Sequence, residues 1–141
     1  MLLAITGDFA DSIILDRIRG GYYDCVVYTP EYPDSNLEKF PIEFFEKDVY
    51  KLVALVWTCV KSETYLIINQ FSNSHKLKDA HNQTLNCYLC YFKKNLNLGR
   101  VTLPSVDFNE QERNSCYIED VVYANLSLIK HPVQGKEFIV S

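Results

Sequence analysis

The 141-residue sequence lacks any uninterrupted run of about 18 apolar residues, the length that a membrane-spanning helix needs. Its most hydrophobic stretch is broken by Lys51, Lys61, Glu63 and Asn69. The amino-terminal segment carries no basic side chain and reaches an acidic one at Asp8, unlike a secretory signal peptide. The sequence therefore predicts a chain that does not contact a membrane and that is intracellular, in the cytoplasm.

An excess of positive charge is also missing, since 14 Lys and Arg residues stand against 18 Asp and Glu residues. The formal net charge is −4 and the isoelectric point is about 5.3. Nucleic-acid-binding proteins use clustered basic side chains, and the basic residues here are scattered, so no nucleic acid is expected as a partner. The 10 Tyr and 8 Phe residues argue against disorder, and the length predicts a single domain over residues 1–141.

Several motifs that carry chemistry are absent. The sequence contains no G-x-G-x-x-G fingerprint, no P-loop and no G-x-S-x-G nucleophile elbow. Its three histidines, His75, His81 and His131, lack the spacing of metal ligands. The sequence therefore predicts neither a metal site nor a cofactor.

The five cysteines form an odd set in a chain without an export signal, which argues against a disulfide framework. Cys87 and Cys90 make a lone C-x-x-C pair, whereas a zinc ribbon needs two such pairs. We expect these thiols to be buried and structural, with redox or metal chemistry as the alternative. The residues at 82–84 and 125–127 match N-glycosylation acceptors, which we interpret as chance matches.

What the sequence does contain is an alternation of short apolar runs with longer amphipathic segments. Short runs rich in β-branched residues that end at a glycine, a proline or a polar residue are typical of buried strands. The predicted strands cover 2–6, 24–29, 64–70, 99–103 and 137–140. The predicted helices cover 9–19, 46–62, 75–94 and 109–131, with a strand over 85–92 as the alternative within the third.

The helix over 46–62 has the strongest pattern. Its apolar positions recur at helical spacing, at Val49, Leu52, Val53, Val56 and Val60. Glu46 and Asp48 in the first turn and Lys61 in the last are expected to complement the helix dipole.

Strands that alternate with helices predict an α/β fold. We expect a three-layer sandwich, with a mostly parallel five-stranded sheet flanked by about four helices, of flavodoxin-like or Rossmann-like type. An all-β sandwich is the alternative fold. The helical stripe over 46–62 argues against it, because strand residues alternate.

Ligands of open parallel sheets bind outside the carboxyl ends of the strands, near the switch in strand order. The predicted ligand-binding residues at that edge are Gly7, Asp8, Asn69, Ser72 and Asp107. Gly7 and Asp8 lead into a helix N-terminus, whose free N–H groups favour an anion. A tight turn with an ordinary helix cap at Asp8 is the alternative interpretation.

Three stretches of the chain follow a familiar layout. The opening strand runs into a turn at 7–9, the helix from 45–60 leads to a strand at 65–69, and 84–92 is followed by a strand at 101–103. This layout resembles the nucleoside 2-deoxyribosyltransferase-like superfamily, whose small flavodoxin-like domains cleave or transfer at N-glycosidic bonds. That family carries an Asp-x-Gly-Thr-x-x-Glu sequence, in which the Glu is the nucleophile that holds the sugar.

Aligned on Thr84, this chain has His81, Gln83 and Cys87 at the family's Asp, Gly and Glu. The resemblance implies a nucleotide- or nucleoside-like ligand, with Asp8, Asp48 and Cys87 as catalytic candidates. Attack on an anomeric carbon needs a carboxylate or an equivalent nucleophile, for which a Cys87 thiolate is the candidate.

The predicted function is therefore that of a small α/β protein that binds a nucleotide- or nucleoside-like ligand at the carboxyl edge of its strands. The resemblance extends this to a degenerate enzyme acting on N-glycosidic bonds. The alternative is a non-catalytic protein-interaction module, which contacts a protein partner or a second copy of the chain through 30–41 and 72–86.

Overall fold

The computed structural model describes residues 1–6, 12–29, 42, 46, 49–71, 87, 90, 97–103, 118–132 and 137–139. Along the chain it contains β1 (Leu2–Thr6), α1 (Ser12–Arg19), β2 (Cys25–Thr29), α3 (Tyr50–Ser62), β3 (Tyr65–Phe71), β4 (Leu98–Leu103), α5 (Ile118–Lys130) and β5 (Glu137–Ile139). All five strands run parallel in one sheet. The predicted α/β fold of flavodoxin-like layout is confirmed, and the all-β alternative is excluded.

The predicted helix over 46–62 starts later than expected. Its α-helical part begins at Tyr50, and Glu46 and Val49 before it have π-helical backbone. The first turn therefore holds no acidic residue, so the expected acidic complement at that end is wrong, whereas Lys61 does lie in the last turn. Of the helix predicted over 75–94, the structure describes Cys87 and Cys90, both helical.

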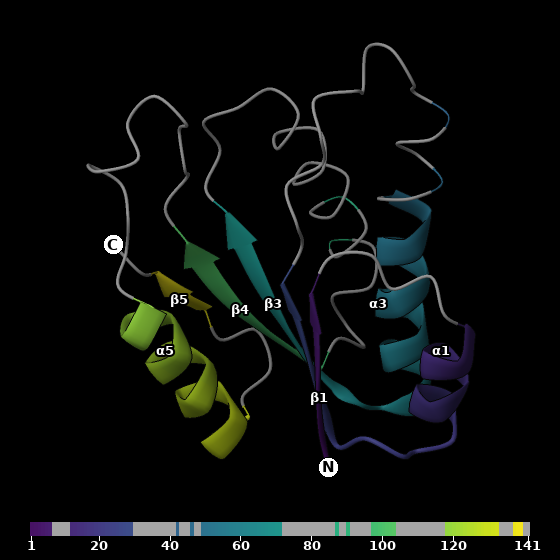
Figure 1. Cartoon of the computed structure of the whole chain (residues 1–141), viewed down its shortest axis with the longest axis horizontal. Coiled ribbons are helices and arrows are strands. Elements are labelled where there is room, and N and C mark those ends of the chain that lie inside the picture. The colour runs from purple at the N-terminus through teal and green to yellow at the C-terminus, as the bar shows by residue number, and fades with distance from the viewer. Residues whose placement is uncertain are drawn as a thin grey trace.

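Helices cover both faces of the sheet (Figure 1). α1 and α3 pack on one face, where Ile18 and Leu52 meet strand residues such as Leu66. α5 packs on the other face, where Ala124 and Leu128 meet Ile67 and other strand residues. We call the space between the sheet and this helix the α5 layer. None of the helices in the described ranges is long and apolar enough to span a membrane.

The strand order follows the sequence, β1-β2-β3-β4-β5, so the chain steps across the sheet in one direction. α1 and α3 lie on one face and α5 on the other (Figure 1). The crossover through α5 therefore has the opposite hand from those through α1 and α3, although parallel crossovers are almost always right-handed. The connections that follow β2 and β4 consequently lead to opposite faces, with β3 between them.

Candidate functional site

A polar pair closes the α5 layer at the carboxyl ends of β2 and β3. Asn69 alternates along β3 with Tyr65 and Ile67, which belong to that layer, and its amide Nδ2 donates to the Thr29 hydroxyl oxygen at 2.7 Å. Thr29 at the end of β2 is the register partner of Thr6 at the end of β1. Polar residues therefore occur at this edge on three neighbouring strands, β1, β2 and β3. The sequence prediction of Asn69 at this edge agrees with its position in the structure.

The second polar atom of the Asn69 amide has no partner. The side chain is only 3% exposed, and its Oδ1 is buried without a hydrogen bond from any residue that the structure describes. Rotating the amide by 180° would only exchange the two atoms, because the Thr29 hydroxyl can donate as well as accept. A buried unpaired polar group of this kind lowers the stability of the folded state by about 1–3 kcal/mol. A ligand that donates a hydrogen bond to this oxygen would remove that loss.

A second asparagine shares this property. Asn125 lies on α5 between Val121 and Ile129, which both pack into the α5 layer. Its Nδ2 donates to the Val121 carbonyl at 2.8 Å, and its Oδ1 is buried with no partner in the described ranges. The α5 layer thus contains two buried amide oxygens that can each accept a hydrogen bond.

The two asparagines lie on the same side of a contact between α5 and the sheet. Leu128 packs over Gly99, since a β-carbon built on that glycine would lie 3.0 Å from the leucine Cδ1. α5 runs down from the carboxyl edge (Figure 1), so Asn125 lies about 4.5 Å above Leu128 toward that edge. Val101, the register partner of Asn69, lies about 6.6 Å above Gly99 in the same direction. Both asparagines therefore lie on the carboxyl-edge side of the contact between Leu128 and Gly99.

The position of β3 explains why a site can form there in a sheet whose strand order never reverses. Ligands of parallel sheets bind where neighbouring connections leave toward opposite faces. The reversal of strand order expected from the sequence is absent, because the order follows the chain. Here the connections diverge for another reason, because α3 and α5 cover opposite faces of the sheet. Asn69 lies on β3, which comes between these two helices in the sequence.

Only one of the predicted ligand-binding residues can be placed. Asn69 lies at the expected edge, whereas Gly7, Asp8, Ser72, Asp107 and the catalytic candidate Asp48 fall outside the described residues. Cys87, the remaining catalytic candidate, has helical backbone and is exposed. Sequence reasoning missed Asn125, and the signal was available: it is a polar residue within the apolar stripe that faces the sheet.

The four cysteines within the described ranges divide into two classes, and Cys116 lies outside those ranges. Cys25 and Cys59 are buried, but Cys87 and Cys90 are exposed, so the expectation that this C-x-x-C pair is buried is wrong. Positions three apart share one side of a helix, which is why both thiols face solvent together. Burial, reinforced by the Asp24 carboxylate, raises the pKa of the Cys25 thiol to about 11. Burial, reinforced by the Cys25 thiol, raises the pKa of Cys59 to about 12.

Alkylation with iodoacetamide at pH 8 is expected to separate these classes. Cys87 and Cys90 should react in the folded protein, whereas Cys25 and Cys59 should react at least about 100-fold more slowly, because the thiolate is the nucleophile. Peptide mapping by mass spectrometry measures the four rates. Equal rates for Cys25 and Cys87 in the native protein would contradict the buried position of Cys25.

The same thiols make stability depend on pH. Their pKa values are raised above the ordinary 9.0, so the folded state keeps protons that the unfolded state loses above about pH 9. The stabilisation is complete below that pH and declines as the pH rises toward 11. Urea unfolding should give a smaller free energy at pH 10 than at pH 8, and alanine at both positions should reduce the difference.

A small recess lies at the opposite edge of the sheet, lined by Cys59, Thr64 and Asn97 among others. Its volume of about 10 Å³ holds at most one water molecule. In the described part of the chain, no group of three or more His, Cys, Asp or Glu residues is placed to hold a metal ion.

Comparison with protein-family models, with curated proteins and with solved structures finds no match for this chain. The assignment of a site therefore rests on the chemistry of Thr29, Asn69 and Asn125.

Proposed function

We propose that this protein binds a nucleoside-like ligand at the carboxyl edge of the sheet, with Asn69 and Asn125 accepting hydrogen bonds from it. The observation that carries the proposal is the buried Oδ1 of Asn69, which has no partner among the described residues, at the edge where parallel α/β sheets bind ligands. Asn125 adds a second buried acceptor, on α5. Catalysis by Asp8, Asp48 or Cys87 stays a prediction from the resemblance.

Two buried acceptors suit a ligand that offers two donors. A nucleoside has such groups in the exocyclic amino group of its base and in the vicinal hydroxyls of its ribose. The amide oxygens would then fix the orientation of the ligand, as a few polar groups do in apolar pockets.

Charge favours a nucleoside over its phosphate at this place. α5 begins at the carboxyl edge (Figure 1), and Glu119 and Asp120 lie in its first turn. These carboxylates neutralise the positive end of the helix dipole and repel a phosphate group. The anion site that the sequence predicts at Gly7 and Asp8 lies outside the described residues and precedes a different helix, α1, which packs on the other face of the sheet.

A thermal-shift titration tests the proposal. At about 1 mM, a nucleoside with a Kd of about 0.1 mM should stabilise the protein by about 1.4 kcal/mol, or about 4 °C in Tm. The corresponding 5′-monophosphate should give a smaller shift. Melting curves that do not move with purine or pyrimidine nucleosides at this concentration would contradict the proposed function.

A further inference from the structure

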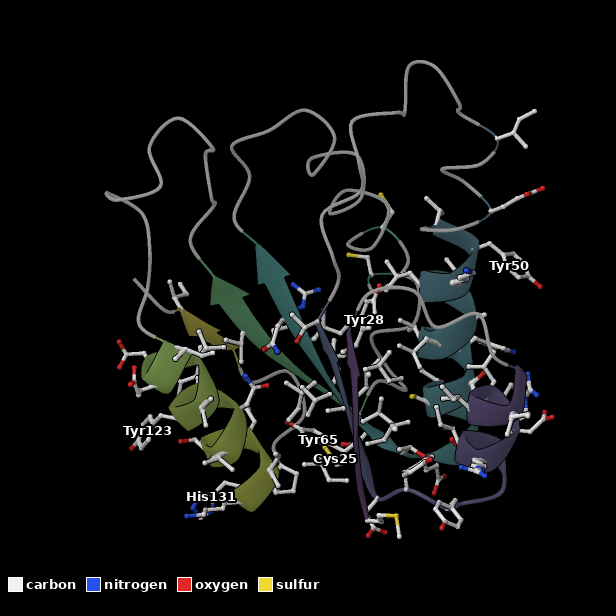
Figure 2. The ribbon with its side chains drawn as sticks, in the orientation of Figure 1. Cys25, Tyr28, Tyr50, Tyr65, Tyr123 and His131 are labelled. Atoms are coloured by element: carbon white, nitrogen blue, oxygen red, sulfur yellow. The ribbon has the colours of Figure 1, made fainter. Side chains whose placement is uncertain are left out.

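The side of α5 that faces away from the sheet is unusually apolar for a solvent-exposed surface. We define the outer face of α5 as Glu119, Val122, Tyr123, Leu126 and Lys130, all of them exposed. Val122 is 50% and Leu126 46% exposed, and the Tyr123 side chain points away from the sheet (Figure 2). A helix that is apolar on both sides is typically buried on both.

Helical geometry makes this face a continuous strip. At 100° per residue, Leu126 lies opposite the side of the helix that Ala124 and Leu128 turn to the sheet. Val122 and Tyr123 flank it one turn earlier. Glu119 and Lys130 lie on the same line at the two ends of the helix, so an apolar centre is bounded by one negative and one positive charge.

The strip is symmetric about a point between Ala124 and Asn125, close to the middle of the helix. Glu119 lies as far before that point as Lys130 lies after it, and Tyr123 and Leu126 are placed in the same way. If two copies of α5 pack antiparallel about a two-fold axis, each Glu119 meets the Lys130 of the other copy. Each Tyr123 then meets a Leu126, so the face is complementary to itself.

We propose that the outer face of α5 is a dimer interface and that its occupant is a second copy of this chain. The interface is isologous, as in most dimers with two-fold symmetry. It lies on the side of α5 turned away from Asn69 and Asn125, so it is independent of the proposed ligand site. A single pair of helices buries less than about 1,200 Å², which predicts a weak and reversible dimer.

Sedimentation equilibrium of the full chain tests this interface. Between about 1 µM and about 1 mM, the average mass should rise from that of one chain toward that of two. Leu126→Glu should weaken the dimer by at least about 100-fold, because it buries a carboxylate at the centre of the apolar strip. The control Tyr50→Glu, which alters an exposed aromatic residue on α3, should leave the dimer unchanged.

Charge reversal distinguishes a second copy from any other partner. Glu119→Lys should weaken the dimer by about tenfold, since both copies then present Lys opposite Lys. The double variant Glu119→Lys with Lys130→Glu restores opposite charges and should return the Kd to within about threefold of the original. Asp120→Lys places the same charge change in the same turn but off the strip, and it should have no effect.

A chain that stays monomeric up to about 1 mM overturns the proposal. A dimer that survives Leu126→Glu overturns it as well. A dimer that Glu119→Lys weakens but that the double reversal does not restore overturns the antiparallel pairing. Circular dichroism of each variant must show the original helix content, so that a loss of dimer is not a loss of folding.

Discussion

Replacing Asn69 with leucine is expected to weaken nucleoside binding by between about 10- and 100-fold while making the ligand-free protein more stable. The loss of binding follows because a ligand donor that now meets Oδ1 would face a methyl group. The gain in stability follows because the substitution removes a buried oxygen that has no partner among the described residues. Opposite effects on binding and on stability are characteristic of a polar group kept for function.

The stability gain should be about 1 kcal/mol, or about 2–4 °C in Tm. Leucine has the same number and branching of side-chain heavy atoms as asparagine and continues the apolar row of Tyr65 and Ile67. The Thr29 hydroxyl loses its partner, but it is only partly buried and can bond to water. Asn125→Leu should weaken binding in the same direction.

Thr64→Val is the matched control for these variants. Thr64 is also a buried polar residue of the sheet region, but it lies at the amino edge and its hydroxyl is bonded to Ser62 at 2.9 Å. Its replacement should lower stability and leave nucleoside affinity unchanged. If Thr64→Val and Asn69→Leu changed affinity equally, the effect would be one of general stability and not of a site.

Replacing Gly99 with valine is expected to lower Tm by about 10 °C, which corresponds to roughly 3–4 kcal/mol. Gly99 is buried on β4, directly beneath α5. A β-carbon there would lie 2.5 Å from the Tyr65 hydroxyl oxygen and 3.0 and 3.2 Å from the two methyl groups of Leu128. The close approach of α5 to the sheet therefore requires the absence of a side chain at this position.

Two variants separate this steric effect from a general intolerance of glycine replacement. Gly20→Ala should change Tm by less than about 2 °C, because a β-carbon there meets only backbone oxygens at 3.4 and 3.6 Å. Gly99→Ala with Tyr65→Phe should be less destabilised than the sum of the single changes, since the phenylalanine lacks the clashing oxygen. A Gly99→Val protein with the same Tm as the wild type would contradict the packing of α5 on β4.

The strands and helices could be predicted because each has a local pattern. β1 begins and ends where its apolar run does, β2 and β4 differ from their predictions by one residue at the start, and β3 is shifted by one residue at both ends. The side of the sheet that α5 covers could not be predicted, because it depends on contacts between distant segments such as Gly99 and Leu128. With strands in sequential order, the right-handed rule places α5 on the same face as α1 and α3.

The candidate site was predictable only in part, for a similar reason. Asn69 ends an apolar strand, so its sequence position alone places it at the carboxyl edge. The role proposed for Asn125 depends on which side of α5 faces the sheet, which the packing of Leu128 on Gly99 determines. The exposure of Cys87 and Cys90 was not predictable either, because an apolar neighbourhood in sequence does not determine which side of a helix meets solvent.

The side-chain amide resonances of Asn69, followed by ¹H–¹⁵N NMR during a nucleoside titration, test the proposed site most directly. Formation of a hydrogen bond to Oδ1 polarises the amide, so the Asn69 NH₂ signals should shift and saturate with the same Kd as the thermal titration, and those of Asn125 should shift with them. The side-chain signals of Asn97, at the other edge, should stay in place. Saturating shifts elsewhere in the protein with both buried amides unmoved would contradict a ligand site at Asn69.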